Sequence, residues 1–267
     1  MNLIGAIIIG IIQGVAEWLP ISSKTQVLLA STFLLDITVS SAYVFGLFME
    51  IGSVGSAAVY FRNDIKNVFK DRNLLTFLIV VTVITGIIGV PLFLISTKVL
   101  YNQYNVGYPM LILGIILIAD GIYIRFSRLR RNLINGKNLS LRDMFLIGVM
   151  QGLAALPGVS RSGMTVSTML ILGYKPEQAF RYSYLAYIPA ALGATGATIF
   201  LQRKILDVAI HSLSPLGLGV SIIAAFLTGL ATIKLLLSFA RRNSIYTVDF
   251  VLGIVAISIS ALIIALG

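Results

Sequence analysis

The chain has 267 residues, of which 58% are hydrophobic and only 11% are charged, and its mean hydropathy is +0.97. The core of a water-soluble protein of this size does not need such values, so we expect a polytopic membrane protein. The net charge of +10 does not indicate nucleic acid binding, because the basic residues lie between apolar runs, where orientation in the membrane explains them better. The absence of cysteine and the single histidine, His211, exclude disulfides, cysteine nucleophiles and two-histidine metal sites.

Short and long apolar segments follow one another in the same order twice. In chain order they are two short arms at residues 3–12 and 26–35, three long runs at 42–61, 74–95 and 108–126, two further arms at 143–156 and 164–173, and three long runs at 180–201, 215–239 and 248–266. The long runs match the roughly 20 residues that a helix needs to cross about 30 Å of hydrocarbon. An arm of about 10 residues rises only about 15 Å. We therefore expect each pair of arms to form a re-entrant helical hairpin.

The basic residues give the expected orientation, because cytoplasmic loops carry an excess of Lys and Arg. If each hairpin begins and ends on one side of the membrane, most of the basic residues fall on one face, which we assign to the cytoplasm. They are Arg62, Lys66, Lys70, Arg72, Arg125, Arg128, Arg130, Arg131, Lys137, Arg142, Lys175, Arg181, Arg241 and Arg242. The opposite face holds only Lys98, Arg203 and Lys204. We expect a multi-pass protein of the cell membrane.

The segment IGIIQGVAEWLP, residues 9–20, resembles IGVMQGLAALP, residues 147–157. Each half is a hairpin followed by three spans, and because three is odd the second half is inserted upside down. We therefore predict one membrane domain, residues 1–267, with an inverted-topology repeat: repeat one at 1–126, a cytoplasmic basic loop at 127–142 and repeat two at 143–267. Such repeats place their site near mid-membrane, where broken helices meet. We expect the two hairpin tips to meet there.

Polar residues interrupt the apolar sequence at both expected tips, in LPISSKTQ, residues 19–26, and LPGVSRSGMT, residues 156–165. Backbone at membrane depth is tolerated only where it is buried in protein or lines a wet cavity. We expect a cavity lined by Gln13, Glu17, Ser22, Ser23, Lys24, Thr25, Gln26, Ser160, Arg161, Ser162, Gly163 and Thr165. An arginine, hydroxyls and a helix N-terminus form an anion site, and the planar guanidinium suits phosphate oxygens.

A carboxylate beside an anion site needs its own explanation, because it repels the ligand. Glu17 could hold a divalent cation that bridges to phosphate, or act as a general base that activates a serine or a water. Glu50, inside the predicted span 42–61, could face the same cavity and bind the same substrate and metal. These roles favour phosphoryl hydrolysis. The structural alternative for Glu17 is pairing with Arg161 or Lys24 to neutralise a buried charge.

The motifs QGVAEWLPISSKTQ and LPGVSRSGMT resemble the two signature regions of the bacitracin-resistance type undecaprenyl-diphosphate phosphatases. The resemblance covers the whole chain in length, repeat and motif order, and the match of residues 157–163 to PGxSRSG is specific. It implies an integral membrane enzyme that removes the terminal phosphate from a polyprenyl diphosphate carrier. It also implies that Arg161 clamps the diphosphate beside Ser160 and Ser162, that Ser22 and Ser23 form a hydroxyl pair with Ser23 as nucleophile, that Glu17 is the essential acid, and that Mg²⁺ or Ca²⁺ is required.

Two positions depart from the family pattern: Gln13 stands where the family usually has a glutamate, and Gln26 where it usually has a histidine. An amide cannot shuttle protons. Lys24 could supply positive charge nearby, and Glu50 could replace the lost acid.

Two functions therefore stay open. The first is a phosphatase that recycles the lipid carrier for cell-envelope glycan synthesis or glycosylation. The second is a flippase or transporter of polyprenyl phosphate on the same scaffold, without hydrolysis. We expect membrane lipids and no nucleic acid as partners, and a cavity that opens to the outer face. The sequence leaves a homodimer and the length of the prenyl chain open.

Overall fold

The computed structural model describes residues 3–19, 22–35, 38–101, 107–128 and 138–240, and after these 247, 250–251, 253–255, 257–258 and 261. These residues form helices and no β-strand, which confirms the predicted all-α membrane fold. The helices are α1 (Leu3–Ala16), α2 (Ser23–Leu35), α3 (Val39–Tyr60), α4 (Arg62–Val68), α5 (Arg72–Tyr101), α6 (Gly107–Arg128), α7 (Leu141–Leu153), α8 (Arg161–Ile171), α9 (Pro176–Leu201) and α10 (Arg203–Ala240).

Four helical segments in the described part of the chain are long and apolar enough to cross a membrane. They are Val39–Tyr60, Arg72–Val99, Pro176–Leu201 and Ser214–Leu235, which correspond to four of the predicted spans. Helix α6 covers the predicted span 108–126, and the predicted span 248–266 lies largely outside the described residues. Within α10 the chain kinks at Ser214, whose φ is 61°, directly before Pro215. Proline lacks the N–H that would continue a helix, so the span predicted from residue 215 begins at this kink.

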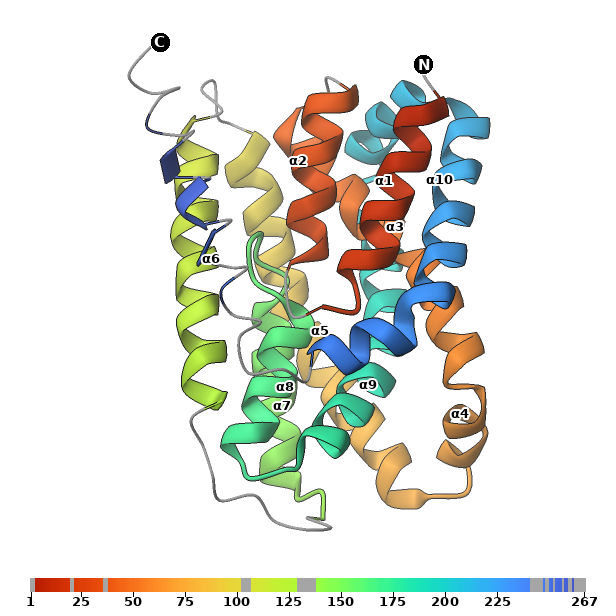
Figure 1. Cartoon of the computed structure of the whole chain (residues 1–267), viewed down its shortest axis with the longest axis vertical. Helices are drawn as coiled ribbons and strands as arrows, with labels where there is room; N and C mark the ends of the chain where they lie inside the picture. The colour runs from red at the N-terminus through yellow and green to blue at the C-terminus, as the bar shows by residue number, and fades with distance from the viewer. Residues whose placement is uncertain are drawn as a thin grey trace.

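The short helices form two pairs at opposite ends of the molecule. Figure 1 shows α1 and α2 in the upper half and α7 and α8 in the lower half, with the connection inside each pair near the middle. Helix α1 packs along α10, and α7 packs along α5, so each pair packs against a long helix from the other half of the chain. The insertion of these pairs into a bilayer as re-entrant hairpins, and the inverted repeat itself, stay predictions.

The glycines shared by the two similar segments explain this packing. Gly10 and Gly14 face α10, and a Cβ on Gly10 would lie 2.3 Å from the carbonyl oxygen of Ser221. Gly148 and Gly152 face α5 in the same way, and a Cβ on Gly148 would lie 2.8 Å from the Cβ of Ile84. Small residues let helix backbones approach closely inside membranes. The repeated glycines therefore fix the same kind of helix crossing twice.

The two ends of the molecule carry different charged residues. At one end, where Figure 1 shows α4, Arg181 at the start of α9 pairs with Asp64 of α4 at 2.6 Å. At the same end the Tyr174 hydroxyl donates to Asp143 of α7 at 2.8 Å. Helices α5 and α9 run from this end to the other, where Lys98, Arg203 and Lys204 line one hollow. The described basic residues are thus distributed as the predicted orientation requires.

Replacing Gly10 with alanine should destabilise the fold, because the new methyl group would meet backbone of α10. We expect Gly10→Ala to lower the free energy of unfolding by about 1–3 kcal/mol. The matched control is Gly5→Ala in the same helix, where a Cβ would meet nothing within 4 Å. Thermal unfolding of both variants in detergent measures the effect. Equal melting temperatures would contradict the proposed role of this crossing.

Candidate active site

The structure brings the two predicted tips together. The backbone N–H of Gly158 donates to Thr25 Oγ1 at 3.1 Å, and the Ser162 hydroxyl donates to the carbonyl oxygen of Leu19 at 2.9 Å. Gly158 has a φ of 92°, in the left-handed region that glycine adopts without strain. Polar groups of each tip are therefore satisfied by the opposite tip, as backbone at membrane depth would require.

Two tyrosines hold the tips in a reciprocal way. Tyr184 of α9 donates its hydroxyl to the carbonyl oxygen of Trp18 in the first tip at 2.7 Å. Tyr43 of α3 donates to the carbonyl oxygen of Ala155 in the second tip. A long helix of each half thus supports the broken hairpin of the other half.

The main electrostatic contact between the tips is an ion pair. Arg161 Nη2 lies 2.7 Å from Glu17 Oε1, and the two side chains are only 9% and 5% exposed. The guanidinium also lies over two aromatic rings, 4.1 Å from the centroid of Tyr187 and 5.4 Å from that of Tyr184. Ring faces attract cations, most strongly where water is excluded. The structural alternative for Glu17, pairing with Arg161, is confirmed.

The other oxygen of Glu17 faces the predicted nucleophile. The Ser23 hydroxyl donates to Glu17 Oε2 at 2.7 Å, and the Gln13 amide donates to the same oxygen at 3.1 Å and to Ser53 at 3.2 Å. A hydroxyl at hydrogen-bond distance from a base, with the base oriented by further groups, is the geometry of an activated nucleophile. Gln13 therefore helps to orient the Glu17 carboxylate. A glutamate at position 13, as in the family pattern, would repel it when both are ionised.

Most of the remaining predicted residues hold the tips in place. Ser160 caps α8, because its side-chain oxygen accepts the N–H of Gly163 at 3.1 Å. Ser22 accepts a hydrogen bond from Thr25 at 2.9 Å, and Thr165 contacts Ser183 of α9 at 2.5 Å. These hydroxyls make the connections between helices rigid.

A second carboxylate and a second cation lie beside this cluster. Lys24 Nζ is 3.7 Å from Glu50 Oε1, and both side chains are 7% exposed. The site thus contains two buried carboxylates and two buried cations. The side-chain nitrogen of Gln26 is buried and has no hydrogen-bond partner in the described part of the chain, so it does not connect Gln26 to this site.

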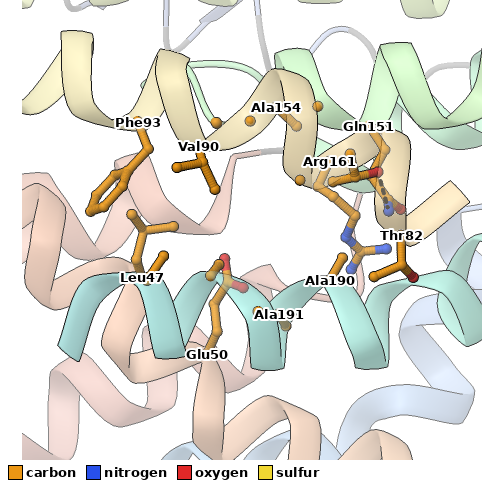
Figure 2. A pocket seen from close by; sticks show the side chains of 18 of the residues that line it. Leu47, Glu50, Thr82, Val90, Phe93, Gln151, Ala154, Arg161, Ala190 and Ala191 are labelled. Carbon is orange, nitrogen blue, oxygen red and sulfur yellow. Dashed lines mark hydrogen bonds between the residues drawn. The ribbon is translucent and has the colours of Figure 1, made fainter. Parts of the chain in front are cut away.

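A cavity of about 180 Å³ lies next to the ion pairs, between α3, α5, α9 and the second tip. Figure 2 shows Arg161 and Gln151 at one end of it and Phe93 and Leu47 at the other. Lys24 and Glu50 also line it. The other predicted tip residues do not border this cavity, and their contact with substrate stays a prediction: Gln13, Glu17, Ser22, Ser23, Thr25, Gln26, Ser160, Ser162, Gly163 and Thr165. Hydrogen bonds across the tips and the cap of α8 account for most of them.

Asp120 was missed by the sequence analysis. This residue of α6 is buried, and its Oδ2 accepts the backbone N–H of Ser160 at 2.9 Å, while its Oδ1 has no partner in the described residues. The signal was available, because Asp120 is an acid inside a predicted span, as Glu50 is. It fixes the backbone directly before Arg161.

The predicted divalent cation can be tested against these residues. No group of three or more acidic or histidine side chains that could hold a metal occurs in the described residues. Mg²⁺ commonly binds through one or two carboxylates together with substrate phosphates rather than through a complete protein cage. Glu17 and Glu50 fit that arrangement, with each carboxylate paired to a cation in the absence of phosphate.

We expect the Asp120 acceptor to stabilise the second tip. Asp120→Asn keeps a side-chain oxygen for the Ser160 N–H, whereas Asp120→Ala leaves that buried N–H unpaired, and neither variant carries the charge. The alanine variant should be less stable than the asparagine variant by about 1–3 kcal/mol. Thermal unfolding in detergent compares them, and equal stability would show that this hydrogen bond does not matter.

Comparisons with known proteins identify the family of this chain. Residues 6–258 match the family described as bacitracin resistance protein BacA. A protein of Sulfurisphaera tokodaii named undecaprenyl-diphosphatase is 58% identical over 98% of both chains. Proteins with the same name from Saccharolobus islandicus and Pyrobaculum aerophilum are 57% identical over 98% of both chains and 37% identical over 97% of both chains. This chain therefore belongs to the BacA family.

Proposed function

We propose that this protein hydrolyses a polyprenyl diphosphate of the undecaprenyl type to the monophosphate and inorganic phosphate. The named relatives support this reaction and nothing in the comparisons supports the transport alternative. The observation that carries the mechanism is the contact of one carboxylate with both functional partners: Glu17 accepts the Ser23 hydroxyl on one oxygen and pairs with Arg161 on the other. The monophosphate product would be the carrier that is reused for envelope glycan synthesis or glycosylation.

Substrate binding would change the partner of Arg161. The diphosphate oxygens compete with Glu17 for the guanidinium, whose planar donors suit phosphate. Once the terminal phosphate binds Arg161, Glu17 is free to take the proton of Ser23. This exchange couples substrate binding to activation of the nucleophile.

The reaction then proceeds in two displacements. Ser23 Oγ attacks the terminal phosphorus and its proton passes to Glu17, while the bond from that phosphorus to the bridging oxygen breaks. The leaving monophosphate takes this proton from Glu17, which is then ionised again. A water molecule next attacks the phosphoserine and gives a proton to Glu17, which returns it to Ser23 Oγ as the bond from phosphorus to that oxygen breaks and inorganic phosphate is released. Arg161 and Lys24 stabilise the charge on the phosphoryl oxygens. None of these reaction steps requires Gln26 to transfer a proton.

Glu17 and Glu50 are the residues that would hold Mg²⁺ or Ca²⁺ together with the diphosphate. A bound divalent cation would supply further neutralisation of phosphate charge. Since the carboxylates are paired with Arg161 and Lys24 in the absence of phosphate, they become available to a cation only as the diphosphate takes over those partners.

The volume of the cavity limits which part of the lipid the protein can enclose. Its volume of about 180 Å³ is smaller than the roughly 300–1,000 Å³ of pockets that enclose a whole small-molecule ligand. The diphosphate headgroup would therefore occupy the cavity while the prenyl tail lies outside it, among membrane lipids. We propose that the cavity opens to the outer face, since its walls on α5 and α9 extend toward the end that has few basic residues.

Phosphate release by the purified protein in detergent tests the reaction, with a C55 or shorter polyprenyl diphosphate and with magnesium, calcium or a chelator. We expect Ser23→Ala and Glu17→Gln to lower the rate by about 100-fold or more. Arg161→Lys should also be slow, because an ammonium group lacks the planar pair of donors. The matched control is Arg181→Lys, which alters an arginine whose ion pair is outside the cavity.

Melting temperatures show whether each variant is folded, since removing one partner of a buried ion pair can cost about 3–5 kcal/mol. Chelator should abolish release by the wild-type protein. Wild-type protein that binds the lipid diphosphate but releases no phosphate would refute the hydrolase proposal. Full activity of folded Ser23→Ala would refute the assigned nucleophile.

A further inference from the structure

A second hollow lies away from the ion pairs, at the end of the molecule where α5 and α9 finish and α10 begins. Its volume is about 530 Å³, and Lys98, Arg203 and Lys204 line it. These are the three basic residues that the sequence places on the face opposite the basic loops. Cations are uncommon on that face, so their gathering in one hollow calls for a physical explanation.

The positive charge in this hollow is not matched by an acidic side chain in its lining, and Asp207 is one turn further along α10. The described residues that line it include no acidic side chain, and in the described part of the chain none of the three cations forms an ion pair. The first turn of α10 adds little here, because the N–H groups of Ile205 and Leu206 donate to the carbonyl oxygen of Gln202. The positive charge comes from the three side chains, which repel one another, and an anion removes that repulsion.

The hollow continues the cavity of the candidate active site along the same two helices. On α5 the cavity is lined as far as Phe93, and the hollow begins at Leu94. On α9 the cavity reaches Ala197 and the hollow begins at Phe200. The lining residues of the two sites are thus consecutive on α5 and three positions apart on α9. On the cavity side Gly193 leaves open space, because a Cβ on it would meet nothing within 4 Å.

Apolar side chains beside the cations indicate a lipid rather than a free ion. Phe200 is 83% exposed, and Leu201 and Leu94 are also exposed next to Lys98 and Arg203. A charged headgroup site bordered by exposed apolar surface is what a lipid with a polar head and an apolar tail requires.

We propose that Lys98, Arg203 and Lys204 form a docking site for the diphosphate headgroup of the lipid substrate. From this site the headgroup moves along the groove between α5 and α9 to Arg161. The inference rests on the proposed hydrolysis, because it takes the substrate of that reaction as the ligand. The docking site increases the local concentration of an anionic substrate at the mouth of the cavity.

Steady-state kinetics of the protein in liposomes tests the docking site, with Lys98→Gln, Arg203→Gln and Lys204→Gln combined. We expect the KM for polyprenyl diphosphate to rise about tenfold, with kcat unchanged, because capture is weakened and chemistry is not. The value of kcat/KM should fall with ionic strength for the wild-type protein and change little for the triple variant. The matched control combines Lys66→Gln, Lys70→Gln and Arg72→Gln, which removes three exposed cations at the opposite end.

Two results would overturn the docking site: an unchanged KM in the first triple variant, or an equal change in the control. Inhibition by inorganic pyrophosphate distinguishes a site for the lipid diphosphate from a site for any free diphosphate. A lipid site predicts that the triple substitution raises the KM for the lipid more than the inhibition constant of pyrophosphate, and equal changes would overturn the lipid assignment. If the wild-type protein releases no phosphate, the proposed function fails; if it does and the KM does not respond, only the docking site fails.

A pair of glycine variants tests the groove. Gly193→Leu places a large side chain in the cavity at a position where a Cβ would meet nothing within 4 Å, and we expect it to slow turnover of the lipid at least about tenfold. Gly196→Leu in the same helix also enters open space but does not line the cavity, so it should retain near wild-type turnover. Equal rates for the two variants would show that the headgroup does not use this path.

Discussion

The buried ion pair between Arg161 and Glu17 is the constraint on which the rest of the site depends. Removing two charges from water costs several kcal/mol per ion, and attraction offsets that cost only where the geometry is good and the remaining donors and acceptors are satisfied. Here Ser23 and Gln13 satisfy the second carboxylate oxygen and the Tyr187 ring covers the guanidinium, whose Nε has no partner among the described residues. Because the partners come from the two tips, this requirement also fixes how the two halves meet.

The same charges explain how a resting site can be stable and still bind phosphate. In the two ion pairs each carboxylate balances one cation, so the pairs do not need further ions to compensate their charge. A diphosphate offers the cations more oxygen atoms than the carboxylates do. The exchange of partners releases the carboxylates at the moment when a base is required, and it needs no large movement of the helices.

Sequence patterns predicted the helices, the meeting of the tips and the cluster of Glu17, Ser23 and Arg161, because apolar length and interrupted polarity are local properties. They did not predict which tip residues line the cavity. Ser160 and Ser162 read as ligand-binding hydroxyls, yet their oxygens cap α8 and hold the first tip, which depends on contacts between distant segments. Asp120 could have been singled out as an acid inside a predicted span, but its role depends on a distant contact, since its partner, the N–H of Ser160, lies 40 positions away.

The reciprocal tyrosine contacts have a consequence for biosynthesis. The carbonyl group of Trp18 is bound by Tyr184, which is 166 positions further along the chain, and Arg161 reaches Glu17 across 144 positions. Until those residues leave the ribosome, the first hairpin carries a charge and polar backbone without these partners. It therefore has to wait at the membrane surface, or under the cover of the insertion machinery, because the hydrocarbon does not tolerate it. Neither half can complete its fold alone, so the order of synthesis makes the second half the step that finishes insertion of the first.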